Sequence, residues 1–321
     1  MKEREKVLFL FDPSFESGLE ELYERYEVVV VPLRRGDSLP EEHRDATVVV
    51  PPFTMPMGKE EIDFFPNVRL IANYAVGYNN IDVAYAHQKG VAVANTPQSV
   101  VRPTAELCVA LLLSLSRRVS EWDRLLRSQR SSRKGGMMTR MGVDLNGKTL
   151  GIIGYGNIGQ CVGKILHDGF GMKMLYNKRI RLSADQEEHL DATYATVDEI
   201  FKTADVVSLH TPYNADSHHL VNSERLAMMK PTAMLINVAR GAVVDEAALV
   251  KALQEGTIAG AGLDVFENDD RPLDALYDLD NVVMTPHVGT QTNDARIAMA
   301  RELANNVVGF LEGDRPVSLV K

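Results

Sequence analysis

The stretch "LGIIGYGNIG", residues 150–159, decides the predicted fold. Gly154, Gly156 and Gly159 stand in G-x-G-x-x-G spacing, after an apolar run and before a helical pattern that covers 160–166. The first glycine permits a tight turn, the second lets backbone N–H groups approach a pyrophosphate, and the third lets helix and strand pack closely. A glycine-rich turn without a ligand can share this spacing, but the strand-turn-helix context favours a dinucleotide site.

Short apolar runs rich in β-branched residues alternate with amphipathic segments on both sides of this stretch. Predicted strands cover residues 7–11, 28–31, 47–50, 69–72 and 91–94, and then 149–154, 173–176, 205–209, 233–238, 260–265 and 281–285. A long helical pattern without a strand, from Thr104 to about Arg127, separates the two series, and a last one covers about 293–312. This alternation predicts parallel sheets with helices on both faces, and so an α/β protein.

Composition excludes several classes of protein. The chain has 321 residues and a net charge of −9, whereas nucleic-acid binders usually carry a basic excess. The two cysteines, Cys108 and Cys161, have no metal-ligand spacing, and the longest apolar run, 107–115, is about half of a membrane span. No signal peptide is recognisable at the N-terminus. We expect a cytoplasmic protein that binds neither nucleic acid nor a membrane.

The stretch "LYNKRIRL", residues 175–182, stands at the end of the second strand of the glycine-loop unit. An acid here would bind a ribose 2′-hydroxyl and favour NAD(H), but no Asp or Glu is present. Asn177, Lys178 and Arg179 would attract a 2′-phosphate, and Arg181, two residues further along, is a further candidate. This pattern predicts a preference for NADP(H), with NAD(H) still possible. A solvated basic turn is the alternative interpretation.

Two further segments place reactive side chains after predicted strands. "LINVARGAVVDEAALVKAL" sets Arg240 in a turn before a helix, and "MTPHVGTQT" sets His287 just after the last strand. Open parallel sheets bind ligands at the carboxyl ends of their strands. A lone arginine is usually a surface charge and a lone histidine a satisfied polar group, so their joint placement carries the functional interpretation.

These segments resemble the D-isomer-specific 2-hydroxyacid dehydrogenase family, particularly its glyoxylate/hydroxypyruvate reductase branch. The matches recur in family order over nearly the whole chain: "NYAVGYNNID" (73–82), "NTPQSVVRPTAEL" (95–107), "GKTLGIIGYGNIG" (147–159), "SLHTP" (208–212), "NVARGAVVDEAAL" (237–249), "GAGLDVFEN" (260–268) and "TPHVGTQT" (285–292). Such a set is far more specific than a glycine motif alone.

The resemblance implies a catalytic group. Arg240 would bind the substrate carboxylate and keto oxygen, and His287 would protonate the carbonyl oxygen as hydride arrives. The family places a glutamate five residues after the aspartate of "LDV", where this chain has Asp269. We predict that Asp269, although one methylene shorter, orients His287 and keeps it charged, with Glu267 as the competing carboxylate.

The resemblance also implies binding residues. Those expected around the cofactor are Thr104, Gly154, Gly156, Asn157, Ile158, Gly159, Asn177, Lys178, Arg179, His210, Thr211, Pro212, Val238, Ala239, Asp264 and Gly289. Asp264 would accept a hydrogen bond from the carboxamide, and His210 would act through backbone atoms. Backbone N–H groups of Val76 and Gly77 would hold the substrate carboxylate, while Phe53 and Met55 would either shape the pocket or belong to the core. No metal site is expected, because His218 and His219 lack a third ligand at a suitable spacing.

From these observations we predict two Rossmann-like or flavodoxin-like doubly wound domains with a cleft between them. Residues 1–99 plus 288–321 would form the substrate domain, and 100–287 the dinucleotide-binding domain. The predicted reaction is reduction of a small 2-keto acid, such as glyoxylate or hydroxypyruvate, to the D-2-hydroxy acid. The alternatives are a 2-ketogluconate or D-lactate type of reductase and a non-catalytic, nucleotide-sensing relative of the corepressor kind. The long helix from Thr104 is expected in a homodimer interface.

Overall fold

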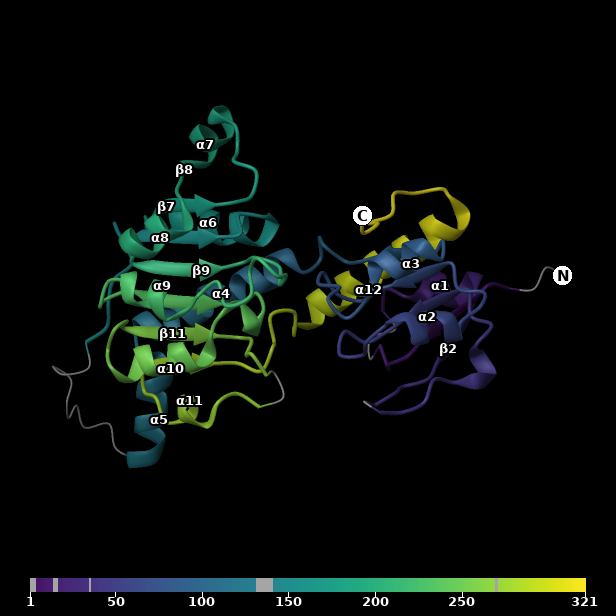
Figure 1. Cartoon of the computed structure of the whole chain (residues 1–321), viewed down its shortest axis with the longest axis horizontal. Helices are drawn as coiled ribbons and strands as arrows, with labels where there is room; N and C mark the ends of the chain where they lie inside the picture. The colour runs from purple at the N-terminus through teal and green to yellow at the C-terminus, as the bar shows by residue number, and fades with distance from the viewer. Residues whose placement is uncertain (1–3, 14–16, 35, 131–140, 269–270) are drawn as a thin grey trace. The chain divides into compact units, whose positions relative to one another are not determined.

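The structure is a computed structural model that describes residues 4–13, 17–34, 36–130, 141–268 and 271–321. The chain divides into two compact units (Figure 1). Unit 1 comprises Met1–Val100 and Thr290–Lys321, and unit 2 comprises Val101–Gly289. Each unit is an α/β structure around one parallel sheet, as the alternation of strands and helices predicts.

Unit 1 has a five-stranded sheet in the order β2-β1-β3-β4-β5, and every strand pair in it is parallel. Its strands are β1 (Lys6–Phe9), β2 (Glu27–Val30), β3 (Val48–Val50), β4 (Leu70–Ala72) and β5 (Ala92–Ala94). Its helices are α1 (Glu20–Arg25), η1 (Glu41–His43), α2 (Lys59–Phe64), α3 (Val83–Gln88) and α12 (Asn293–Glu312). Leu8, Val49, Ile71 and Val93 are fully buried, because both faces of the sheet are covered.

Unit 2 has a seven-stranded sheet in the order β12-β11-β10-β9-β6-β7-β8, again with every pair parallel. Its strands are β6 (Thr149–Ile153), β7 (Lys173–Asn177), β8 (Ala192–Tyr194), β9 (Val206–Leu209), β10 (Met234–Asn237), β11 (Gly260–Leu263) and β12 (Val282–Met284). Its helices are α4 (Val101–Ser116), α5 (Val119–Gln129), α6 (Asn157–Phe170), α7 (Ala184–Leu190), α8 (Val197–Thr203), α9 (Ser223–Met228), η2 (Gly241–Val243), α10 (Glu246–Gln254) and α11 (Asp274–Tyr277).

The structure differs from the sequence-based expectation in two places. Strand β8 was not predicted, because three residues at a sheet edge are too few to show a period. The long pattern from Thr104 to Arg127 is two helices rather than one, since Arg118 adopts a left-handed conformation with φ of 56°. Hydrophobic periodicity continues through this break, so the sequence does not reveal it.

No helix among the described residues is long and apolar enough to cross a membrane. Cys108 is buried and Cys161 is half-buried, and neither forms a disulfide. No group of three or more potential metal ligands occurs in the described ranges.

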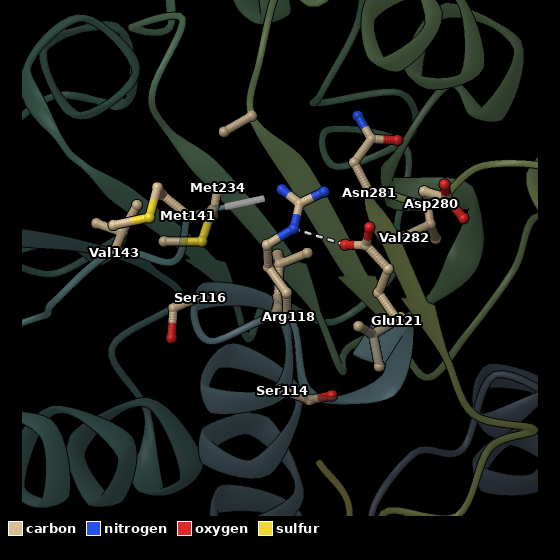
Figure 2. A pocket seen from close by; sticks show the side chains of 13 residues that line it. Ser114, Ser116, Arg118, Glu121, Met141, Val143, Met234, Asp280, Asn281 and Val282 are labelled. Carbon is tan, nitrogen blue, oxygen red and sulfur yellow. Dashed lines mark ion pairs between the residues drawn. The ribbon is translucent and has the colours of Figure 1, made fainter. Parts of the chain in front are cut away.

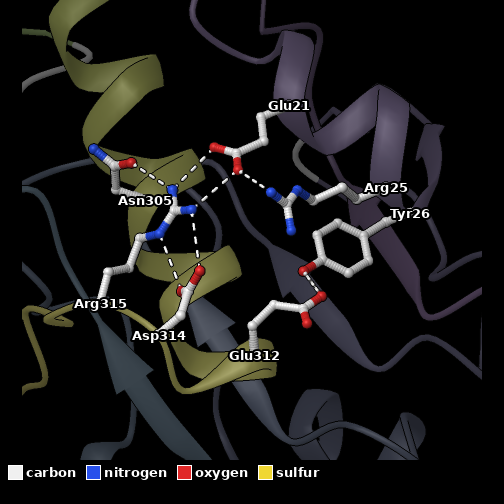
Figure 3. A network of polar contacts seen from close by, with 7 residues as sticks. All are labelled: Glu21, Arg25, Tyr26, Asn305, Glu312, Asp314 and Arg315. Carbon is white, nitrogen blue, oxygen red and sulfur yellow. Dashed lines mark hydrogen bonds and ion pairs between the residues drawn. The ribbon is translucent and has the colours of Figure 1, made fainter.

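The C-terminal helix α12 packs in unit 1 with the N-terminal strands and helices. Figure 3 shows the polar contacts that connect α1, α12 and the tail. The Arg315 guanidinium donates to both carboxylate oxygens of Glu21, at 3.0 and 3.1 Å, and also contacts Asn305 and Asp314. This hydrogen-bonded pair lowers the pKa of the Glu21 carboxyl. Tyr26 adds a hydrogen bond of 2.9 Å to Glu312.

Replacing Arg315 with alanine should lower the free energy of unfolding of unit 1 more than replacing Arg25 does, because a forked arginine-carboxylate pair and its network are lost. Arg25 provides the matched control, since it binds the same carboxylate at 3.0 Å within one helix. R25A should cost only about 0.3–0.5 kcal/mol. Urea unfolding followed by circular dichroism measures both, and equal losses would contradict the assignment of Arg315 as the main connection.

Candidate active site

Two of the three glycines of the 154–159 loop, Gly154 and Gly159, have a steric reason to lack a side chain. Gly154 has φ of 94°, and a Cβ there would lie 2.5 Å from the carbonyl carbon of His210. A Cβ on Gly159 would lie 2.5 Å from the backbone oxygen of Gly154. Around Gly156, by contrast, nothing lies within 4 Å of the Cβ position. The loop is therefore closed toward the sheet and open above Gly156.

The open space above Gly156 lies at the N-terminus of α6, which has 14 residues. No side chain caps this helix end in the described part of the chain. The first backbone N–H groups, those of Asn157 and Ile158, are therefore available for an anion, and the helix dipole favours one there. These residues fit the pyrophosphate of a dinucleotide.

In the basic stretch after β7, some side chains are bonded to other described groups of the protein and others are not. Asn177 donates from its amide nitrogen to the Ala195 backbone oxygen, at 2.9 Å. Arg181 binds both carboxylate oxygens of Glu187 at 2.8 Å and lies over the Tyr194 ring. The Arg181 guanidinium, followed by the hydroxyl of Tyr176, lowers the pKa of Glu187 to about 2.

Lys178 and Arg179 have no comparable partner. Across the described ranges, no hydrogen bond or ion pair engages either side chain. Lys178 is half-buried and Arg179 is exposed. Two cations beside the glycine loop are therefore available to a ligand, whereas Arg181 holds α7 in place.

His210 follows β9 and lies against the glycine loop. Its Nε2 is 2.8 Å from the hydroxyl of Ser208, which in turn lies 3.3 Å from the Cys108 sulfur. Burial lowers the pKa of His210 to about 3. Its Nδ1 is buried without a hydrogen-bond partner among the described residues. His210 is thus a neutral imidazole, and Thr211 and Pro212 continue the chain at the same sheet edge.

Arg240 stands in a turn that its neighbours hold rigidly. The amide of Asn237 donates to the Arg240 backbone oxygen at 3.0 Å and accepts from the Ala239 N–H at 3.0 Å. Val238 and Ala239 are buried. A Cβ on Gly241 would lie 1.7 Å from the Phe266 backbone oxygen, so the segment after β11 crosses directly over this turn.

Asp264 organises the segment that carries His287. Its carboxylate accepts from the Thr285 hydroxyl at 2.7 Å, the Val288 N–H at 2.8 Å and the Gly289 N–H at 3.0 Å. Asp264 is 1% exposed, and burial raises the pKa of its carboxyl although these hydrogen bonds act to lower it. His287 itself has φ of 55°, a conformation that this bonding maintains.

Thr104 and Gly289, which are far apart in the sequence, lie close together beside Asp264. The Cβ position of Gly289 lies 3.3 Å from the Asp264 carboxylate and 3.4 Å from the Thr104 hydroxyl. The expected role of Asp264 was to accept from a carboxamide. Its structural role, holding the His287 segment, is a function that the sequence pattern did not indicate.

The competing carboxylate, Glu267, is engaged elsewhere. It lies 2.6 Å from Nε2 of His219 and accepts weakly from the Glu246 N–H at 3.4 Å. The buried carboxylate of Glu246 accepts from the N–H groups of Glu267 and Leu273, at 2.9 and 2.6 Å. Glu246 was missed by sequence reasoning. Asp269, the predicted partner of His287, lies outside the described residues.

The predicted substrate residues all belong to unit 1. Val76 and Gly77 lie in the turn after β4, and Phe53 and Met55 lie in the segment after the neighbouring strand β3. The amide of Asn80 joins the two segments through a 3.1 Å hydrogen bond to the Met55 backbone oxygen. Phe53 is 51% exposed, whereas Met55 packs partly against the core.

A separate small cavity of about 60 Å³ lies at the opposite edge of the unit 2 sheet. Figure 2 shows the ion pair between Arg118 and Glu121 in it, near Met234 and Val282, which begin β10 and β12. Because it is lined from the amino ends of these strands, this cavity is distinct from the residues described above.

Comparisons with known proteins place the chain in one family. Residues 109–289 match the model of the family "D-isomer specific 2-hydroxyacid dehydrogenase, NAD binding domain". A glyoxylate reductase of Thermococcus onnurineus is 42% identical, over 95% of this chain and 92% of that protein.

Solved structures give the same result. The NADPH-dependent glyoxylate/hydroxypyruvate reductase of Sinorhizobium meliloti, in complex with NADP and malonate, is 32% identical with a TM-score of 0.88, over 99% of this chain and 97% of that one. The D-lactate dehydrogenase of Aquifex aeolicus, complexed with NAD and lactic acid, is 30% identical with a TM-score of 0.83, over 96% of each chain.

The low pKa of His210 predicts a pH dependence of stability. An unfolded histidine, with a pKa near 6.5, binds a proton before the folded one, with a pKa of about 3, so stability falls as pH drops through this window. The slope attributable to His210 reaches about 1.4 kcal/mol per pH unit. H210Q, which keeps a donor near Ser208, should show a shallower decline in urea unfolding between these pH values. Parallel curves for the two proteins would contradict this prediction.

Proposed function

Because the chain belongs to the D-isomer specific 2-hydroxyacid dehydrogenase family, we propose that it reduces a small 2-keto acid of the glyoxylate or hydroxypyruvate kind to the D-2-hydroxy acid. The observation that carries this proposal is the common placement of Arg240, His287 and the glycine loop. All three follow strands at the carboxyl edge of one parallel sheet, where such sheets bind ligands.

Arg240, His287 and Asp264 have different roles in the proposed reaction. Arg240 binds the carboxylate and polarises the keto oxygen, because a guanidinium offers a fixed fork of donors. His287 gives its proton to that oxygen during reduction and takes it back in the reverse direction. The nicotinamide cofactor, when bound, supplies the hydride. Asp264 keeps the His287 segment in place through the three hydrogen bonds that its buried carboxylate accepts.

We propose that NADP(H) is preferred over NAD(H), with Lys178 and Arg179 binding the 2′-phosphate. Their lack of partners in the described ranges supports this role, as does the absence of an acid between residues 176 and 182. The S. meliloti reductase is NADPH-dependent, whereas the A. aeolicus enzyme was solved with NAD. One amide hydrogen of Asn177 is already bonded to the Ala195 backbone oxygen, so the contribution of Asn177 to binding the 2′-phosphate stays a prediction.

Glyoxylate is favoured as substrate class by the name of the T. onnurineus relative, while the A. aeolicus structure keeps a D-lactate type of reductase as a second candidate. The homodimer and the cytoplasmic location stay predictions, as do the substrate contacts of Val76, Gly77, Phe53 and Met55. The pairing of Asp269 with His287 is likewise a proposal.

The wild-type chain should oxidise NADPH in the presence of glyoxylate or hydroxypyruvate. H287A should lower kcat by about 10²- to 10⁴-fold, because the proton donor is lost. R240A should lower kcat/KM by about a hundredfold or more, because the carboxylate loses a charged, forked partner. Absorbance of NADPH measures these rates, and H189A, which removes an exposed histidine of α7, provides the control. No turnover of any 2-keto acid by the wild type would refute the enzymatic function.

The cofactor preference has a separate test. K178A/R179A should lower kcat/KM for NADPH by about 10- to 100-fold, since charge-assisted hydrogen bonds to phosphate are lost, and should leave kcat/KM for NADH nearly unchanged. R181A provides the matched control, because this neighbouring cation is bound to Glu187. It should not change the ratio of the two efficiencies. If the ratio of kcat/KM for NADPH to that for NADH changes in R181A and not in K178A/R179A, the stretch is a solvated turn and does not select the cofactor.

A further inference from the structure

In unit 1, the backbone oxygens of the turn after β4 accept hydrogen bonds from nearby side-chain and backbone donors. The side-chain amide of Asn73 donates to the Ala75 oxygen at 3.2 Å and to the Gly77 oxygen at 2.7 Å. Between them, the amide of Asn95 donates to the Val76 oxygen at 2.8 Å. Thr96 adds its backbone N–H to the Ala75 oxygen at 3.1 Å. Three consecutive carbonyl groups are thereby fixed in direction.

Fixing a carbonyl also fixes the next N–H. In a trans peptide, the C=O of one residue and the N–H of the next point in opposite directions within one plane, and this chain has no cis peptide among its described residues. With the Ala75 and Val76 oxygens turned to side-chain donors, the N–H groups of Val76 and Gly77 turn away from those donors. Neither N–H group has an acceptor in the described ranges, and both residues are half-buried.

Asn73 donates two hydrogen bonds to the turn, but its own side-chain oxygen is left without a donor in the described part of the chain. Its side chain is fully buried, and its Oδ1 has no hydrogen-bond partner among the described residues. The amide nitrogen must face the turn, because both of its partners there are carbonyl oxygens. A buried acceptor without a partner is unfavourable, so the position is not optimised for stability alone.

We propose that Asn73 is a positioning residue: it holds the Ala75 and Gly77 carbonyls on either side of the Val76 carbonyl, which Asn95 holds, so that the N–H groups of Val76 and Gly77 receive the carboxylate of the substrate. This inference rests on the proposed function, since it requires a 2-keto acid as the ligand. Consecutive backbone N–H groups that point the same way form a concavity that binds anions. Asn73 touches the turn and not the substrate, so it acts through the direction of the peptide planes.

The isosteric variant N73D removes both donors and keeps the shape of the side chain. In the full-length chain, KM for glyoxylate should rise about 10- to 100-fold while kcat changes far less, because the lost interaction binds substrate and transition state alike. The inhibition constant of oxamate, an unreactive carboxylate analogue, should rise by the same factor. The dissociation constant of NADPH, measured by fluorescence, should stay the same, since the predicted cofactor residues belong to unit 2.

N306D is the matched control, because Asn306 is a buried asparagine of the same unit that donates to the Asn95 backbone oxygen at 2.8 Å. It should reduce stability without raising KM or the oxamate constant. Should N73D fail to fold, as judged by circular dichroism, the smaller and uncharged N73S allows the same measurements.

An unchanged KM in N73D, or an equal rise in N306D, would overturn the inference while the wild type still turns over glyoxylate. Failure of the wild type to reduce any 2-keto acid would instead count against the proposed function. In that case calorimetric titration with oxamate decides the role of Asn73, since equal affinities for wild type and N73D would reject it.

Discussion

The parallel hydrogen-bond register of the unit 2 sheet is the constraint on which the rest of the site depends. Because all seven strands run the same way, the residues that follow them meet at one edge. Gly154, His210, Arg240, Asp264 and His287 come from five different segments of the chain, yet each follows such a strand. A parallel sheet also requires helical crossovers, which bury both of its faces and leave its carboxyl edge for ligands.

Buried polar side chains then fix the loops at that edge. Asp264 holds the His287 segment, Asn237 holds the Arg240 turn, and Glu246 accepts from the backbone N–H groups of Glu267 and Leu273. In unit 1, Asn73 acts in the same way on the turn after β4. These groups satisfy backbone atoms that no strand or helix partner reaches, and an unsatisfied buried group would be costly. These hydrogen bonds hold in place the loops that carry the reactive side chains.

The basic side chains near the glycine loop differ in whether an acidic residue neutralises them. Arg181 is neutralised by Glu187 and supported by Tyr194, while Lys178 and Arg179 keep their charges available to a ligand. His210, although close to the loop, stays neutral because burial disfavours its charged form. The local environment therefore determines which of several basic residues can contribute to the binding of a phosphate.

The sequence by itself determined the α/β class, the two parallel sheets, the last helix at 293–312 and the glycine loop, because period and glycine spacing are local properties of the chain. It also indicated Arg240 and His287, through their positions after apolar runs. It did not reveal β8, the break at Arg118 or the pairing of Glu267 with His219. Nor did it assign Asp264, Glu246 and Asn73 to backbone groups of other loops. Only the tertiary structure decided these contacts, since a buried polar group takes its partner from segments that the fold, and not the sequence order, brings within hydrogen-bond distance.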